Sequence, residues 1–383
     1  MSNKNSSRVF LCLAVTLALS VQAGCRRNAT QPAPENGNIK IGVLVDLAHA
    51  GDGQSIKNAI EFSQDEINQA GGVNGRQLEI LIVDYKGAAD NGAAEAANLI
   101  SQKNVQAIIW QSPTASSVAA TSPAQAPRIP LITISPRDPK VTEQSDSVFN
   151  ITPLDSSQGQ QMGAYAANNL KARTAAILIE DGSAYSVGLA QSFADEFSKR
   201  GGQVSSRQTY KPTDQSFSQL IASISEANPD VVYVPGRDAA VATIAVESKQ
   251  KGVKAVLLGA DGWNDPKVLS VGGRALDGAY ITSGYSADDP SPEARAFSAA
   301  YKRRFGGAPD QAAALAYDAT KILADALKRS GSDRAKLRDA LQQTAKFSGL
   351  TGVITFEAGR NASRPAIIFK LQDGKVYPVY KEE

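Results

Sequence analysis

The stretch that decides the fold has a strand–helix–strand pattern and runs from residue 39 to residue 84. It reads IKIGVLV at 39–45, QSIKNAIEFSQDEINQ at 54–69 and LEILIVD at 78–84. The apolar runs are typical of strands buried on both faces, and the segment between them has apolar residues at helical spacing. Gly71-Gly72 ends the helix, and Asn74-Gly75 favours a tight turn because both residues tolerate a positive φ. The stretch predicts one β-α-β unit of a parallel sheet.

The same alternation continues along the chain and predicts two Rossmann-like α/β lobes with parallel sheets. Extended segments near 150, 281 and 353 mark three crossings between the lobes, as in a three-strand hinge. Helical segments fill 293–344, and a β-rich tail follows, in which Asp373-Gly374 predicts a hairpin. We therefore expect lobe 1 to comprise 39–150 and 281–352, and lobe 2 to comprise 151–280 and 353–383. Ligands of such sheets bind beyond the carboxyl ends of the strands, in the cleft between lobes.

Composition excludes several classes of protein. The chain has 383 residues, enough for two domains, and a hydrophobic content of 42% gives each a core. A formal net charge of +2 is too small to indicate a nucleic-acid partner or a polybasic membrane patch. One histidine and two cysteines argue against a histidine-rich metal site and a disulfide scaffold. We expect no metal and no other cofactor.

The N-terminus predicts export. Lys4 and Arg8 precede an apolar segment at 9–21, which is too short for a confident transmembrane helix. Ala23-Gly24-Cys25 then resembles a bacterial lipoprotein signal, with 1–24 removed and Cys25 lipidated, although Gln22 stands where that signal prefers leucine. The alternative is an ordinary secretory signal cut near Ala23. Residues 25–38 are polar and predict a flexible tether.

Sequence signatures of enzymes are missing. The chain has no phosphate-binding loop, no GxGxxG after the first strand, and no cysteine or histidine cluster. The single histidine, His49, lies in a loop of small residues without a nucleophile motif, so we expect it at the cleft mouth. No helix-turn-helix segment precedes the first lobe, which argues against a ligand-responsive repressor. A hydrolase-like or transferase enzyme is therefore the weakest of the alternatives.

Polar loops follow several predicted strands and are candidates for a binding site. Ser112 and Thr114 precede a helix, where hydroxyl groups and free N–H groups suit a carboxylate, although plain helix capping is an equal alternative. Asp261 ends a strand, where its carboxylate would pair with an ammonium group or cap the next helix. Tyr185 follows another strand and offers a ring face or a hydroxyl group; its alternative is surface packing.

At these residues the chain resembles the type I periplasmic binding proteins of the leucine/isoleucine/valine-binding kind, which deliver amino acids to ABC importers. Matching pieces are spread from 39 to 378. They lie in this order: IKIGV at 39–43, EINQAGGVNGR at 66–76, AYSVGLA at 184–190, NPDVV at 228–232, AYDA at 316–319 and FSGLTG at 347–352. The resemblance implies the type I fold and hinge closure of two lobes on an amino acid.

The resemblance also implies roles for particular residues. Thr114 matches the family's carboxylate-binding serine, Tyr185 its cleft tyrosine, and Asp261 its ammonium-binding acid. The loop after Ser135, a further ligand-binding position, is shorter than the family's and lacks its threonine. Arg237 stands where a second tyrosine is usual. Trp110, in place of a small glycine, is a third departure, and together these departures leave the identity of the ligand open. A strictly branched-chain aliphatic ligand is less favoured because the cleft loops carry many charges.

The charged residues of the same loops point to two kinds of ligand. Arg137 or Arg237 would select an acidic side chain, whereas Asp52 and Asp138 would favour a cationic ligand; solvated rim charge is the alternative for both arginines. The sequence thus predicts a monomeric, exported, lipid-anchored solute-binding protein of an ABC permease. It would bind a small polar molecule, most simply an amino acid. The alternative is a ligand-sensing module of the same fold that signals to a membrane partner.

Overall fold

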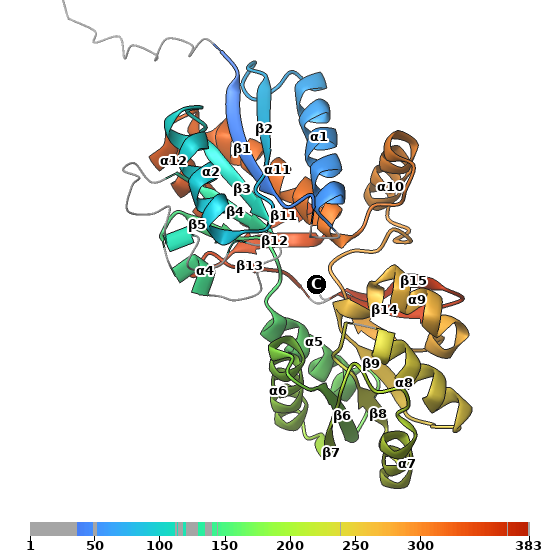
Figure 1. Cartoon of the computed structure of the whole chain (residues 1–383). Coiled ribbons are helices and arrows are strands. Elements are labelled where there is room, and N and C mark those ends of the chain that lie inside the picture. Colours follow the sequence, from blue (N-terminus) through green and yellow to red (C-terminus); the bar gives the residue numbers. More distant parts are fainter. Residues whose placement is uncertain are drawn as a thin grey trace, which may run out of the picture. The chain divides into compact units, whose positions relative to one another are not determined.

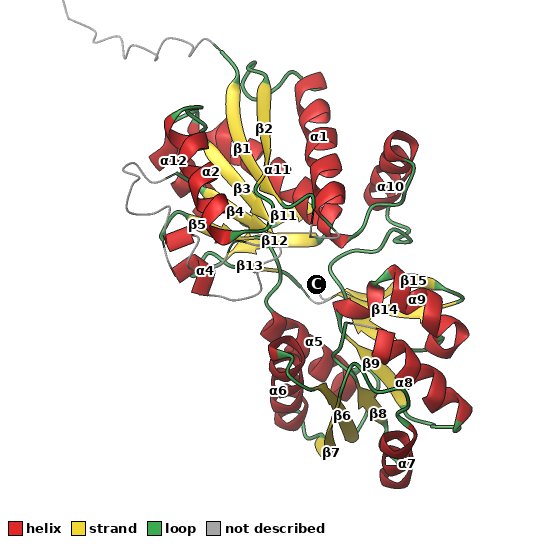
Figure 2. Cartoon of the chain, in the orientation of Figure 1, coloured by secondary structure: helices red, strands yellow, loops and turns green. Residues whose placement is uncertain are grey.

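Two lobes, each with its own β-sheet and helices, make up the fold (Figure 1). The computed structural model describes residues 37–48, 52–111, 113, 118–119, 129–134, 140–143, 145–237, 239–365 and 367–381. The chain from Asn38 to Glu383 forms one compact unit. Helices lie along the sheets of both lobes, as the predicted alternation requires (Figure 2).

The first sheet is entirely parallel and has the strand order β2-β1-β3-β4-β5. Its opening strand–helix–strand unit agrees with the prediction to within one residue. The elements of this part are β1 (Ile39–Val45), α1 (Gly53–Gln69), β2 (Leu78–Asp84), α2 (Ala89–Ser101), β3 (Ala107–Gln111), β4 (Leu131–Ile134), α4 (Lys140–Glu143) and β5 (Val148–Asn150).

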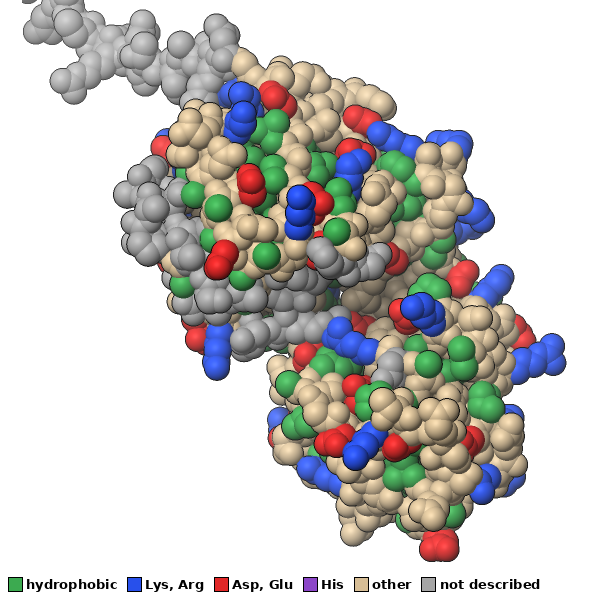
Figure 3. All heavy atoms as spheres, in the orientation of Figure 1, with side chains coloured by type: hydrophobic (Ala, Val, Ile, Leu, Met, Phe, Trp, Pro, Cys, Tyr) green, Lys and Arg blue, Asp and Glu red, His purple; other side chains and the backbone are tan. Residues whose placement is uncertain are grey.

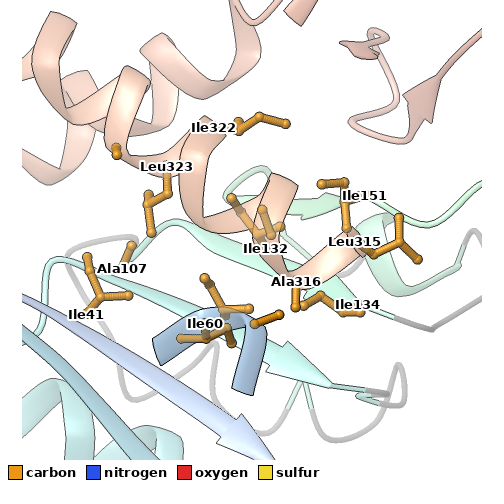
Figure 4. Packing of buried hydrophobic residues seen from close by; sticks show 14 of the residues in the cluster. Ile41, Ile60, Ala107, Ile132, Ile134, Ile151, Leu315, Ala316, Ile322 and Leu323 are labelled. Atoms are coloured by element: carbon orange, nitrogen blue, oxygen red, sulfur yellow. The ribbon is translucent and has the colours of Figure 1, made fainter. Parts of the chain in front are cut away.

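The helices covering one face of this sheet come from both ends of the lobe's sequence. These are α1 together with α10 (Pro292–Phe305), α11 (Gln311–Ser330) and α12 (Arg334–Gln342). Ile60 of α1 and Leu323 of α11 meet Ile41 and Ile132 of the strands in one buried cluster (Figure 4). Fully burying such a side chain contributes about 1.5–3 kcal/mol. The predicted helical segments at 293–344 thus complete the first lobe's core.

The second sheet has seven strands in the order β15-β14-β10-β9-β8-β6-β7. Its first five strands in sequence, β6 to β10, are parallel to one another. Strand β14 is antiparallel to β10, and β15 is antiparallel to β14. The elements are α5 (Asp155–Asn168), β6 (Thr174–Glu180), α6 (Ala184–Lys199), β7 (Gln203–Tyr210), α7 (Ser218–Ala227), β8 (Val231–Tyr233), α8 (Ala239–Gln250), β9 (Val256–Gly259), η1 (Asp261–Asn264), α9 (Pro266–Gly272), η2 (Gly273–Leu276), β10 (Tyr280–Thr282), β14 (Ile367–Gln372) and β15 (Lys375–Lys381).

The third crossing differs from the sequence prediction. Strands β11 (Phe347–Gly349), β12 (Gly352–Phe356) and β13 (Ala362–Ser363) form a small separate sheet. Ile354 and Phe356 pack in the first lobe's core, and the Phe356 ring lies 5.1 Å from that of Phe149. Because these apolar side chains are buried there, the chain leaves the first lobe between Ser363 and Ile367, not near 353. Likewise, β10 pairs within the second sheet, so the second crossing follows Thr282.

The predicted turns are confirmed. Asn74 and Gly75 have φ angles of 52° and 79°, and Asp373 and Gly374 have φ angles of 51° and 71°. The second pair joins β14 to β15 as a hairpin. Within the described part of the chain, no helix is long and apolar enough to cross a membrane.

Candidate functional site

Three of the predicted site residues lie at the carboxyl ends of neighbouring strands. Tyr185 lies in the first turn of α6, which follows β6, whereas Arg237 follows β8 and Asp261 follows β9. These strands are adjacent and parallel in the second sheet, so their carboxyl ends share one edge. The sheet topology therefore brings together side chains that are far apart in the sequence.

Contacts join these three side chains directly. The Tyr185 hydroxyl donates a hydrogen bond of 2.5 Å to Asp261 Oδ1. The Arg237 guanidinium carbon lies 3.6 Å from the centroid of the Tyr185 ring, in a cation–π arrangement. Tyr185 and Asp261 are partly buried, whereas Arg237 is exposed. The cluster therefore places a carboxylate at the Tyr185 hydroxyl and an exposed cation over the Tyr185 ring.

A buried glutamine that the sequence analysis missed supports this cluster from α5. Gln158 Oε1 accepts hydrogen bonds from the Asp261 backbone N–H at 3.4 Å and from the Thr282 hydroxyl at 3.1 Å. In the core of the same lobe, Tyr233 stacks on Phe193, with ring centroids 4.4 Å apart. Burial first, and then the negative charge of Asp261, raises the pKa of Tyr233. Gln158 has no sequence signal, because its partners lie over 100 residues away.

The surroundings of Tyr185 and Asp261 bear on the capping and packing alternatives. The N-cap residue of η1 is Ala260, which has no capping side chain, and Asp265 caps the following helix, α9, by accepting from the Lys267 N–H. Ser183 caps α6 by accepting from the Ser186 N–H at 3.2 Å. Tyr185 does pack against the hydrophobic core, and its hydroxyl still reaches Asp261. The Asp261 carboxylate thus accepts from Tyr185, while neighbouring side chains cap α6 and α9.

In the first lobe, Asp52 contacts Gln111 at the end of β3, a residue that the sequence analysis did not single out. Its Oε1 accepts from the Asp46 N–H at 2.9 Å, and its Nε2 donates to Asp52 Oδ1 at 2.6 Å. Its carbonyl accepts from the Tyr85 hydroxyl at 3.0 Å. Burial, followed by the charges of Asp46, Asp52 and Asp84, raises the pKa of Tyr85 to about 12. Asp52 therefore belongs to a polar network at this sheet edge.

Trp110, which stands where the family usually has a small glycine, lies in the core of the first lobe. Its indole is fully buried in the core cluster that contains Leu99 and Tyr85. A Cβ at Gly92 of α2 would lie 2.5 Å from Trp110 Cζ2, so the missing side chain of Gly92 makes room for the indole. Side chains alternate between the faces of a strand, so Trp110 points into this core while the next residue, Gln111, faces the other way. Trp110 is therefore a core residue of the first lobe.

Several predicted residues lie outside the described part of the chain. They are Cys25, His49, Ser112, Thr114, Ser135, Arg137 and Asp138. Among the residues that are described, no cluster of histidine, cysteine or acidic side chains has the arrangement of a metal site. Charged side chains of both signs are interspersed over the face shown in Figure 3. That face shows no extended basic surface of the kind that nucleic acid requires.

Comparison with known proteins covers nearly the whole chain. The family model described as periplasmic binding protein matches residues 38–375. The Leu/Ile/Val-binding protein homolog 3 of Brucella melitensis is 27% identical over 346 residues, which cover 88% of this chain and 93% of that protein. The leucine-, isoleucine-, valine-, threonine- and alanine-binding protein of Pseudomonas aeruginosa is 27% identical over 76% of this chain and 78% of its own length.

Solved structures show the same relationship. The branched-chain amino acid transporter substrate-binding protein LivJ of Streptococcus pneumoniae, in complex with isoleucine, is 28% identical, with a TM-score of 0.72. The match covers 89% of this chain and 99% of that one. A branched-chain amino acid ABC transporter structure from Rhodospirillum rubrum reaches a TM-score of 0.82 at 24% identity, which shows the fold. This chain therefore belongs to the periplasmic binding protein family, of the type I kind that includes the leucine-, isoleucine- and valine-binding proteins.

Proposed function

We propose that this protein is a monomeric, extracytoplasmic solute-binding protein that captures an amino acid and delivers it to an ABC permease. The observation that carries the proposal is the Asp261 carboxylate, held by Tyr185 at the shared edge of three parallel strands. A fixed carboxylate at such an edge suits the ammonium group of an amino acid. Two relatives named above are described as binding amino acids, and this supports the same class of ligand here.

The ligand's carboxylate would bind at the first lobe. Ser112, Thr114 and Ser135 follow β3 and β4 in the sequence, and their hydroxyl groups would provide donors, as would the N–H groups of the helix start predicted there. Binding to both lobes at once would favour the closed arrangement, because a ligand shifts a conformational equilibrium by its differential affinity. The closed form would then dock on the permease. In this proposal the protein carries out no reaction and uses no cofactor.

Arg237 would determine which side chains the site prefers. Its guanidinium is exposed and stacked on Tyr185, so it can pair with a carboxylate that enters beside the ring. We therefore infer a site that accepts polar and acidic side chains more readily than its aliphatic-binding relatives. Export, with acylation of Cys25 as the membrane anchor, completes the proposal.

The test is a calorimetric titration with each of the common amino acids, preceded by a thermal-shift screen. A ligand at 100 times its Kd stabilises the protein by about 2.7 kcal/mol, which is readily seen as a higher midpoint. Asp261→Asn keeps an acceptor for Tyr185 but removes the charge, so binding should fall by at least about tenfold. Asp265→Asn is the matched control, because asparagine also caps a helix. Equal binding by both variants would remove Asp261 from the site.

A further inference from the structure

The second crossing, at residues 283–289, leads from β10 of the second lobe to α10 of the first lobe. Its first residues are bound by the first lobe. The Ser283 hydroxyl and the Gly284 N–H both donate to Oε1 of Gln311, at 2.9 and 3.2 Å. Gln311 is the first residue of α11, so these bonds tie the start of the crossing to a core helix of the first lobe.

Later residues of the same crossing are bound by the second lobe. The buried Ser286 hydroxyl donates to the carbonyl oxygen of Val376 at 2.6 Å, and the Val376 N–H donates to Asp288 Oδ2 at 3.3 Å. Val376 lies on β15, the outermost strand of the second sheet. The chain that leaves the second lobe is therefore held first by the first lobe and then again by the second.

Tyr285, between these two sets of contacts, is held from both sides. Its ring is buried in the core of the first lobe, 6.3 Å from the ring of Phe297. Its carbonyl oxygen accepts from Asn264 Nδ2 at 2.9 Å, and Asn264 is the last residue of η1 in the second lobe. One residue of the crossing thus carries contacts of both lobes.

The short helix η1 also connects the crossing with the proposed amino-acid site. Asp261 begins η1 and Asn264 ends it. Trp263, between them, is fully buried, and its indole N–H donates to the carbonyl oxygen of Val234 at 2.9 Å. This anchor fixes η1 to the core of the second lobe, so Asn264 moves with that lobe and with Asp261.

The other two crossings are joined to each other. On the third crossing, Arg364 Nη2 donates at 2.6 Å to the carbonyl oxygen of Ile151 on the first crossing. Where both segments leave the first lobe, Asn150 Nδ2 donates to Asn361 Oδ1 at 3.2 Å. These bonds allow the first and third crossings to bend as a pair, whereas the bonds of the second crossing connect the two lobes.

We propose that the second crossing is a latch, which holds the lobes in one relative arrangement and has to open when they move. A bend before Ser283 breaks the contacts with Asn264 and Val376. A bend after Asp288 breaks the contacts with Gln311, and a bend between these points breaks both sets. Hinge movements concentrate the change in φ and ψ in a few such residues.

This inference rests on the lobe movement of the proposed function, but it does not depend on which ligand is bound. The experiment uses pulsed electron paramagnetic resonance to measure the distance between two nitroxide labels on the purified full chain without ligand. Ala94→Cys on α2 and Ala222→Cys on α7 place a label at an exposed position in each lobe. Serine replaces the two native cysteines, so that only these positions are labelled.

Gln311→Ala removes the acceptor of two hydrogen bonds and should widen the distance distribution by a factor of about two or more. Gln342→Ala is the matched control, because Gln342 donates to the carbonyl oxygen of Glu357 within the first lobe. The control should keep the wild-type distribution. Asn264→Ala tests the latch from the second lobe and should widen the distribution as well.

A second pair of labels detects loss of structure within a lobe. Ser198→Cys on α6 and Ala222→Cys lie in the second lobe, and their distance should be the same in every variant. The proposal is overturned if Gln311→Ala or Asn264→Ala keeps the wild-type distribution between lobes. Equal widening in Gln342→Ala, or widening within the second lobe, also overturns it. An amino-acid screen without a ligand would contradict the proposed function alone, because this measurement uses none.

Discussion

The Tyr185 hydroxyl donates a 2.5 Å hydrogen bond to the carboxylate of Asp261, a residue that follows a different strand of the same sheet. The Tyr185 ring also carries the Arg237 guanidinium on one face. The Tyr185 side chain thus contacts both Asp261 and Arg237, which follow two neighbouring strands of the sheet. The arrangement holds the Asp261 carboxylate in place and leaves Arg237 exposed to solvent.

Replacing Tyr185 with phenylalanine removes the hydroxyl and keeps the ring under Arg237. We expect the free energy of unfolding to fall by about 1 kcal/mol and amino-acid affinity to fall several-fold, because Asp261 loses a charge-assisted hydrogen bond. Urea denaturation and calorimetric titration measure these effects. Tyr377→Phe, at an exposed tyrosine of β15, should change neither quantity. Unchanged affinity in Tyr185→Phe would show that the hydroxyl does not position Asp261 for ligand.

Replacing Arg237 with methionine tests selectivity. The ratio of the affinities for glutamate and leucine should shift by about tenfold towards leucine, because a charge-assisted contact is lost. Stability should change by less than about 1 kcal/mol, since the cation–π contact is exposed. Arg207 is an exposed arginine of the same lobe that donates a hydrogen bond to Gln191, and Arg207→Met should leave the affinity ratio unchanged. An equal loss for both amino acids would contradict a role in selectivity.

Two helix glycines form a matched pair that tests the packing of Trp110. Gly92→Ala should destabilise the protein by about 1–3 kcal/mol, because the new Cβ would lie 2.5 Å from the indole. Gly188→Ala, on α6, meets open space and should stabilise the protein by about 0.5–1 kcal/mol through helix propensity. Urea denaturation measures both changes. If Gly92→Ala is as stable as wild-type protein, the indole does not pack against α2.

Asp230 predicts a pH dependence of stability. Hydrogen bonds from the Arg173 and Thr174 N–H groups, at 2.7 and 2.9 Å, hold the pKa of its carboxyl below the usual range. A depressed pKa contributes stability above the unfolded-state pKa of about 3.9, and this is lost as the pH falls through the lower folded-state value.

Asp230→Asn should therefore be less stable than wild-type protein at pH 7, by no more than about 1 kcal/mol because the side chain is exposed. The difference should shrink as the pH falls below about 4. Glu226→Gln, at an exposed acid of α7, provides the comparison. A difference that stays constant between pH 7 and pH 3 would mean that the charge of Asp230 is irrelevant.

The lipid anchor is tested by labelling. Cells expressing the wild-type chain and grown with radioactive palmitate should yield a labelled protein in the membrane fraction. Cys25→Ala should abolish the label, because Cys12 is the sole other cysteine and lies inside the expected signal. Ser20→Ala is a control within the same segment. Label retained in Cys25→Ala would favour an ordinary signal cut near Ala23.

Local patterns in the sequence predicted most of the elements. The unit from Ile39 to Asp84, the turns at Asn74-Gly75 and Asp373-Gly374, and the alternation that sets the parallel sheets all depend on neighbouring residues. The predicted lobe boundary near residue 353 was wrong because it, too, depended only on neighbouring residues. A short strand looks alike in either lobe, and only the burial of Ile354 and Phe356 assigns it to the first.

The candidate site, too, was predictable from the sequence only in part. Its placement at strand ends follows from the sequence, because parallel strands separated by helices put their carboxyl ends at one edge. The sequence alone therefore determined the α/β class and the succession of strands and helices along the chain. It also indicated Tyr185, Arg237 and Asp261 as site candidates. Only the tertiary structure decided that Trp110 points into a core, that Gln158 supports Asp261, and that Arg364 reaches Ile151 across 213 residues. Periodicity and turn chemistry are local, whereas these contacts exist only once distant segments pack together.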